Sequence, residues 1–150
     1  MLRLSKKLLF AIEAVLDIAY NAGALPVQSG EITKRQGIPR RYLEQVLQQL
    51  VRANILVGVR GPRGGYRLAR ERRRITVGEI VRTAMSLSTA DPDDLGANSL
   101  LLERVIDPTV KKAGETFLAN LDAITVENMC ETAEQAHVLD DEKTAGDFAI

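Results

Sequence analysis

Residues 38–68 read IPRRYLEQVLQQLVRANILVGVRGPRGGYRL, and this stretch decides the fold. Pro39 suits the first turn of a helix, because the N–H that proline lacks would be unpaired there. Apolar side chains then recur at helical spacing, which predicts a helix over 39–54 with an apolar stripe of Leu43, Val46, Leu47, Leu50 and Val51. Two β-prone runs, 55–60 and 66–69, flank a Gly- and Pro-rich turn and predict a β-hairpin.

Two helices are predicted upstream of this stretch. The first covers 5–22, with Ser5 as its cap and an apolar stripe of Phe10, Ile12, Val15, Ile18 and Ala19. The second covers 29–36, with Ser29 as its cap and Ile32 facing inward. A basic and then apolar start also suits a signal peptide, but Glu13 and Asp17 interrupt the apolar run and favour an amphipathic helix.

Downstream, Thr76 and Glu79 form a capping box that starts a short helix over 77–86. An acidic loop over 85–98 is predicted to separate this basic domain, residues 1–84, from a helical part over 99–136. In that part a long helix covers 99–121 and is kinked or split at Pro108. Thr125 caps a last helix over 126–135, and a loose tail occupies 137–150.

The long helix carries an apolar stripe that extends further than one small domain can cover. We expect this stripe to pack on its own domain, on a second copy of the chain, or on both. Its members are the candidate dimer interface: Leu102, Val105, Ile106, Val110, Ala113, Phe117 and Leu121.

Charge divides the chain into two parts. Residues 1–84 hold 16 Lys and Arg against 6 Asp and Glu, a net charge of +10. Residues 85–150 hold 4 Lys and Arg against 14 Asp and Glu, a net charge of −10. The basic part suits a polyanionic partner, and the acidic part limits where that partner binds.

The element order, helix, short helix, turn, helix and hairpin, is that of a winged helix-turn-helix, a mainly α fold with a small β wing. Its third helix suits the DNA major groove, where Arg40 and Arg41 in the first turn can meet base edges. Gln45 and Gln48 suit adenine, and Glu44 suits a cytosine amino group. The wing carries arginines suited to a minor groove, Arg60, Arg63 and Arg67. Taken singly, Arg40 and Arg41 also suit a solvated helix end, and the glycines from Gly61 to Gly65 also suit a tight turn.

Several segments resemble the IscR/NsrR family of bacterial transcriptional regulators: FAIEAVLDIA at 10–19, RQGIPRRYLEQ at 35–45, VRGPRGGYRLA at 59–69 and TVGEIV at 76–81. The resemblance is dense over 4–84 and can be followed to about residue 130. It implies a homodimeric winged-helix repressor or activator whose long helix crosses its partner. By position, Tyr42, Glu44 and Gln45 match the recognition-helix motif, and the wing motif is matched by Arg60, Gly61, Pro62, Gly64, Gly65 and Tyr66.

The complete set of expected DNA contacts combines this match with charge and position: Lys6, Lys7, Ser29, Pro39, Arg40, Arg41, Tyr42, Glu44, Gln45, Gln48, Arg60, Gly61, Pro62, Arg63, Gly64, Gly65, Tyr66 and Arg67.

Many members of the family hold an iron–sulfur cluster with three cysteines in the loop before the long helix. Here that loop, about 88–100, has no cysteine, and the chain contains one Cys and one His, so we expect no metal site and no cofactor. Carboxylates at Asp91, Asp93 and Asp94 suit weak Ca²⁺ or Mg²⁺ binding, but a solvated acidic loop is favoured. Cys130 is a candidate redox switch. Its neighbours Glu127, Glu131 and Glu134 raise its expected pKa and favour an inert thiol.

The sequence therefore predicts a cytoplasmic, DNA-binding transcriptional regulator, a repressor that acts as a homodimer on a near-palindromic operator. The alternative is a regulator that docks a partner enzyme, with or without DNA. A small-molecule or protein effector is compatible with either. Catalysis is not expected, because the sequence has no nucleophile–base pair and no cofactor motif, and no apolar run reaches the roughly 18 residues that span a membrane.

Overall fold

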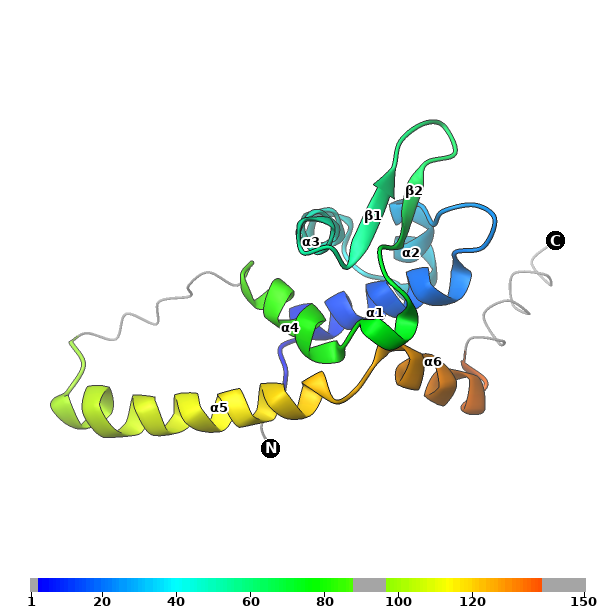
Figure 1. Ribbon diagram of the computed structural model, residues 1–150. Coiled ribbons are helices and arrows are strands. Elements are labelled where there is room, and N and C mark those ends of the chain that lie inside the picture. Colours follow the sequence, from blue (N-terminus) through cyan, green and yellow to red (C-terminus); the bar gives the residue numbers. More distant parts are fainter. Residues whose placement is uncertain (1–2, 88–96, 139–150) are drawn as a thin grey trace.

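The computed structural model describes residues 3–87 and 97–138, which form a winged helix-turn-helix domain with two further helices beneath it (Figure 1). The winged domain contains α1 (Lys6–Asn21), α2 (Ser29–Gln36), α3 (Arg40–Arg52), β1 (Leu56–Val59), β2 (Gly65–Leu68), the 3₁₀ turn η1 (Arg72–Arg74) and α4 (Val77–Met85). The C-terminal part contains the π-helical turn η2 (Leu102–Ile106), α5 (Asp107–Asp122) and α6 (Val126–Gln135). This order confirms the predicted fold class.

α1 lies at the centre of the core, because its apolar side chains occur on a broad face that the other helices cover. Residues of α1, α2, α3, α4 and α6 join in one cluster, whose largest fully buried side chains include Ile18, Ile32, Ile38, Leu43, Leu47, Leu50, Ile75 and Ile80. Among the residues that the structure describes, Asp17 is the charged side chain buried in this core. Ser5 stands at the start of α1 as predicted, although its side chain makes no capping hydrogen bond.

The wing is a two-stranded antiparallel hairpin that pairs Leu56 with Leu68 and Val59 with Gly65. On the edge of β2 that faces away from β1, Val27 of the α1–α2 loop forms an isolated antiparallel bridge with Tyr66. A Cβ added at Gly65 would collide with the carbonyl oxygen of Val27, so glycine permits this close approach. The second strand is thus hydrogen-bonded along both of its edges.

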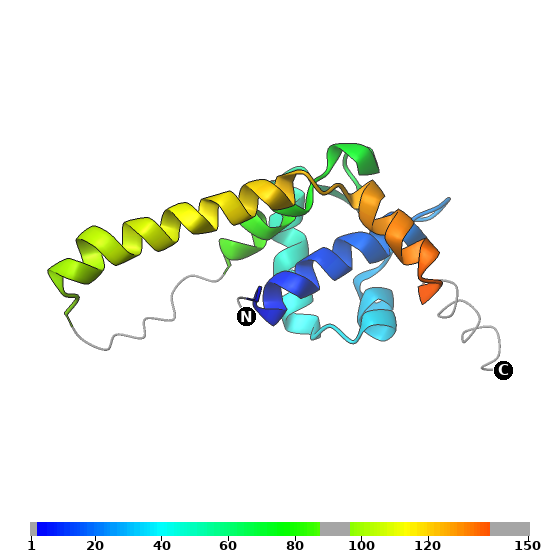
Figure 2. The same cartoon turned by 90° about the horizontal axis from the view of Figure 1, so that it is seen from below.

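The C-terminal helices join the winged domain through main-chain hydrogen bonds. Thr76 caps α4 by accepting from the Glu79 N–H at 3.2 Å, as the capping box predicts. Beside it, the Val77 N–H donates to the Ile124 carbonyl at 2.8 Å, and the Val126 N–H donates to the Ile75 carbonyl at 2.9 Å. The starts of α4 and α6 are thereby held together, and α6 lies against α1 (Figure 2).

Pro108 does not split the long helix as one of the two expectations had it; instead, a widened turn precedes the proline. In η2 the N–H of Asp107 donates to the carbonyl of Leu102, five residues earlier. Proline has no N–H to donate, and its ring clashes with the carbonyl four residues before it in a regular α-helix. The π-helical turn relieves that clash, so the helix continues past Pro108 without a break.

Some sequence-based expectations lie outside the described residues. These are the structure of 88–96, with Asp91, Asp93 and Asp94, and that of the tail over 139–150. Among the helices that the structure does describe, none combines the length and the hydropathy of a bilayer-spanning segment.

Candidate nucleic-acid interface

α3 presents one polar face to solvent because its apolar face is completely buried. Leu43, Val46, Leu47 and Leu50 are each 0% exposed. The opposite face carries the residues predicted to read bases, all of them exposed: Arg40, Arg41, Glu44, Gln45 and Gln48. Val51, the last member of the predicted apolar stripe, does not join the buried face, since it is 36% exposed. Val51 lies in the last turn of α3, on the side of the helix that borders the groove beside the wing, whereas Leu50 of the same turn is buried.

A groove of about 500 Å³ separates α3 from the wing. Residues from both elements line it: Gln48, Val51 and Arg52 from α3, and Gly58, Val59, Arg60, Gly65 and Tyr66 from the wing. Arg52 and Arg60 therefore supply a cation to each wall of one groove. Sequence reasoning missed Arg52, although its position four residues after Gln48 places both on the same face of the helix.

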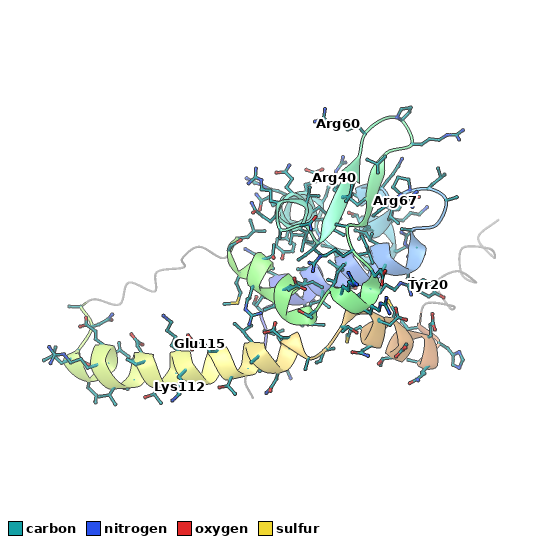
Figure 3. All side chains as sticks on the ribbon, viewed as in Figure 1. Tyr20, Arg40, Arg60, Arg67, Lys112 and Glu115 are labelled. Atoms are coloured by element: carbon teal, nitrogen blue, oxygen red, sulfur yellow. The ribbon has the colours of Figure 1, made fainter. Side chains whose placement is uncertain are left out.

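The wing tip extends away from the helical body, on the side of the molecule opposite α5 (Figure 1). Pro62 and Arg63 at the tip are exposed. Gly61 adopts a φ of 114°, which favours glycine, and the Gly64 N–H closes the turn on the Gly61 carbonyl at 2.9 Å. Arg60 lies on the side of the hairpin that faces α3, the helix that carries Arg40, whereas Arg67 lies on the opposite side of the hairpin (Figure 3).

The N-terminus of α1 lies beside the start of α3. The hydroxyl of Tyr42 donates to the Lys7 carbonyl, and the Tyr42 ring lies 6.2 Å from the Phe10 ring, centroid to centroid. The Lys6 Nζ is 5.6 Å from the centre of the Phe10 ring. The structure thus brings Lys6 and Lys7, both exposed, close to the start of α3. Tyr42 itself is half-buried, and burial raises its pKa.

A buried ion pair holds α2 against α1. Asp17 accepts hydrogen bonds from Arg35 Nε at 2.9 Å, from Arg35 Nη2 at 2.8 Å and from Gln36 Nε2 at 2.9 Å. The prediction that Ser29 caps α2 is wrong. Gln28 is the cap, and its N–H donates to the Glu31 carboxylate at 3.0 Å, so Ser29 is the first helical residue.

The exposed charges of α3 are available to a ligand at little cost. Arg40 Nε donates to Glu44 Oε1 at 3.1 Å, but the two side chains are 78% and 52% exposed. A surface pair of this kind contributes about 0.3–0.5 kcal/mol to stability. Either partner can therefore exchange this contact for a phosphate or a base edge.

Cys130 lies inside the fold, away from this surface. Its side chain is 1% exposed on α6. Burial raises the pKa of the thiol. The charge of Arg72 opposes this shift, and Glu127, Glu131 and Glu134 add to it. The predicted direction is confirmed, although burial is a larger cause than the glutamates. Within residues 3–87 and 97–138, which the structure describes, no three His, Cys, Asp or Glu side chains lie together in a way that could bind a metal ion.

Comparison with known proteins defines the class. The Rrf2 family model, described as "Iron-dependent Transcriptional regulator", matches residues 4–132. The HTH-type transcriptional regulator IscR of Sodalis glossinidius is 42% identical over 80 residues, 53% of this chain and 48% of that protein. IscR of Escherichia coli strain K12 / DH10B is also 42% identical, over 49% of its length. The matched segment thus spans about half the length of these curated relatives.

Solved structures extend the likeness over most of the chain. The structure of T. potens IscR has a TM-score of 0.68 and 34% identity, and the match covers 90% of each chain. CymR, named as the global cysteine regulator of B. subtilis, has a TM-score of 0.63 and 25% identity over 88% of this chain and 98% of its own. These neighbours and the helix–wing surface define a winged helix-turn-helix regulator, which is not an enzyme class. The chain belongs to the Rrf2 family of transcriptional regulators, which confirms the resemblance seen in the sequence.

Proposed function

We propose that this protein is a transcriptional repressor that binds a near-palindromic operator as a homodimer, in the cytoplasm. One observation supports this most directly: Gln48 and Arg52 of α3 border the same groove as Arg60 of the wing. A helix of this width fits the major groove, and the wing then meets the adjacent backbone or minor groove. The relatives named as HTH-type regulators support the same function.

Binding to DNA is tested with the region upstream of the protein's own gene. Fluorescence anisotropy measured over a series of salt concentrations should give specific binding whose affinity falls steeply, because phosphate contacts release counterions. The double variant Arg40→Glu with Arg41→Glu should lose binding and keep its oligomeric state, because both side chains are exposed and outside the core. An affinity that does not change with salt, or a double variant that binds like the wild type, contradicts the proposal.

The proposed homodimer is supported by apolar side chains that lie in solvent on η2, on the residues just before it and on the first turn of α5. Leu101 is 62% exposed, Val105 54%, Ile106 43% and Val110 64%. At the other end of the helix, Leu118 and Leu121 pack against the core of their own domain. The stripe thus divides into a half that covers its own domain and an exposed half that a second copy would bury.

An apolar groove of about 400 Å³ continues from this exposed half. The segment before α1 lines it together with α1, α4 and α5, through Arg3, Leu4, Leu8, Met85, Lys111, Gly114, Glu115, Phe117 and Leu118. Light scattering should show a dimer at micromolar concentration, and Val105→Asp with Val110→Asp should give a folded monomer. A wild-type monomer at that concentration contradicts the homodimer.

We also infer that the protein acts without an iron–sulfur cluster. The family model is described as iron-dependent, and cluster ligation needs several thiolates. This chain has one cysteine and one histidine; Cys130 is buried in α6, and His137 is exposed just after its end. This donor set does not fit a three-cysteine cluster. Iron and sulfide analysis of protein purified without oxygen tests the inference, and a stoichiometric cluster would contradict it.

The exposed half of α5 also suits a second candidate, docking of a partner enzyme. The two candidates differ in which molecule covers these exposed residues, a second copy of the chain or a partner enzyme. If a partner enzyme binds there, Val105→Asp should abolish capture of that enzyme, while the side chains of α3 and the wing in each monomer can still contact DNA. If capture survives this change, the exposed apolar residues are not the docking surface.

A further inference from the structure

Arg67 is charged and belongs to the wing, yet it does not extend toward the groove (Figure 3). We propose that Arg67 is a positioning residue that fixes the direction of the wing by holding it to the α1–α2 loop, residues 22–28. This inference rests on the proposed function, in which the wing contacts DNA. It gives Arg67 a different role from Arg60 and Arg63, which are exposed.

The guanidinium of Arg67 binds two neighbouring main-chain acceptors. Its Nη1 donates to the Gly23 carbonyl at 2.7 Å, and its Nη2 donates to the Ala24 carbonyl at 2.8 Å. Hydrogen bonds from a charged donor are stronger than neutral ones, and the planar fork of arginine fits two adjacent acceptors at once. A lysine keeps the charge, but its single ammonium cannot reproduce the fork. Charge and geometry can therefore be separated at this position.

The same loop makes a second attachment next to the first. The Val27 N–H donates to the Tyr66 carbonyl at 3.0 Å, and the Tyr66 N–H donates to the Val27 carbonyl at 2.7 Å. The Arg67 contacts and this bridge thus involve consecutive residues of β2. Together they hold β2 along the edge that β1 does not cover.

These attachments matter because the wing is small. Each of its strands has four residues, and an isolated two-stranded hairpin is marginally stable in water. The direction of the tip therefore depends on what holds the outer strand. The carbonyls of Gly23 and Ala24 belong to the segment that leads directly into α2, so Arg67 connects the wing to the helix-turn-helix itself.

The test compares Arg67 with Arg63, the exposed arginine of the tip. Four variants, Arg67→Gln, Arg67→Lys, Arg63→Gln and Arg63→Lys, are titrated with the upstream DNA over a series of salt concentrations. Loss of a phosphate contact lowers the slope of log affinity against log salt by about 0.9, and lysine restores such a contact. We expect this behaviour for Arg63. For Arg67 we expect both variants to bind about tenfold more weakly, with the wild-type salt slope.

Hydrogen exchange of the DNA-free protein gives a readout that does not depend on DNA. The amides of Val27 and Tyr66 should exchange faster in both Arg67 variants and at the wild-type rate in both Arg63 variants, while thermal unfolding confirms that each variant folds. A wild-type affinity in Arg67→Lys, or a slope lowered by about 0.9 in Arg67→Gln, would make Arg67 a phosphate contact and overturn the inference. If the wild type binds no DNA, the proposed function fails. Unchanged exchange at Val27 and Tyr66 overturns the role of Arg67 separately.

Discussion

Replacing Asp17 with Asn tests whether the buried ion pair holds α2 in place. The Asp17 side chain is 0% exposed and accepts three hydrogen bonds, two from Arg35 and one from Gln36. Hydrogen bonds to a charged group contribute about 1.5–3 kcal/mol each, and Asn retains one acceptor but loses the charge. The Arg35 side chain is 28% exposed and regains part of its hydration. We therefore expect a loss of about 3 kcal/mol, a large share of a typical 5–15 kcal/mol.

Urea unfolding followed by circular dichroism measures this loss. Glu71→Gln is the matched control, because it removes a carboxylate from an ion pair with Arg73 in which both side chains are more than half exposed, and it should leave stability within experimental error. Asp17→Leu with Arg35→Met should recover most of the lost stability, since well-packed apolar residues often replace a buried pair without cost. A loss below about 1 kcal/mol for Asp17→Asn would refute the reasoning.

Three further predictions concern other parts of the fold. Gly78→Ala should lower the Tm by about 5 °C in calorimetry, because the new Cβ collides with the Asp122 carboxylate, and an unchanged Tm would contradict that packing. Burial raises the pKa of Glu79. Hydrogen bonds from Thr76 and Arg70, together with the charge of Arg70, outweigh burial, so the pKa lies below its ordinary value of 4.5. Its contribution to stability is therefore present above pH 4.5 and is lost as the pH falls through the folded pKa. Glu79→Gln should accordingly be less stable than the wild type at neutral pH and converge with it in acid, and urea titrations that run parallel at all pH values would show this to be wrong. Cys130 is buried with a raised pKa, so Ellman's reagent should modify it at the rate of unfolding, and rapid modification of the native protein would contradict the burial.

Features that depend on near neighbours in the chain could be predicted from the sequence. The capping box of Thr76 and Glu79 and the buried stripe of α3 both follow from spacings of three and four residues. Two positions depart from these patterns for local reasons. Gln28 takes the capping role expected of Ser29 because Glu31 lies at the matching third position. Val51 belongs to the apolar pattern but faces the groove beside the wing.

Features that depend on distant partners could not be predicted. Asp17 and Arg35 lie 18 residues apart, and no periodic pattern connects them. Arg67 meets carbonyls 43 and 44 residues away, and main-chain acceptors leave no trace in a sequence. Position and charge alone therefore group Arg67 with Arg60 and Arg63, although the fold directs it elsewhere.

The π-helical turn before Pro108 also decides which way the first residues of the long helix point. A wide turn adds one residue relative to α-helical winding, and one residue corresponds to a rotation of about 100°. Leu100 and Leu101 are therefore set at a different azimuth around the helix axis than uninterrupted winding would give them. Through this turn, Pro108 affects the direction in which Leu100 and Leu101, two turns earlier, project from the helix, and therefore the side on which a partner would contact them.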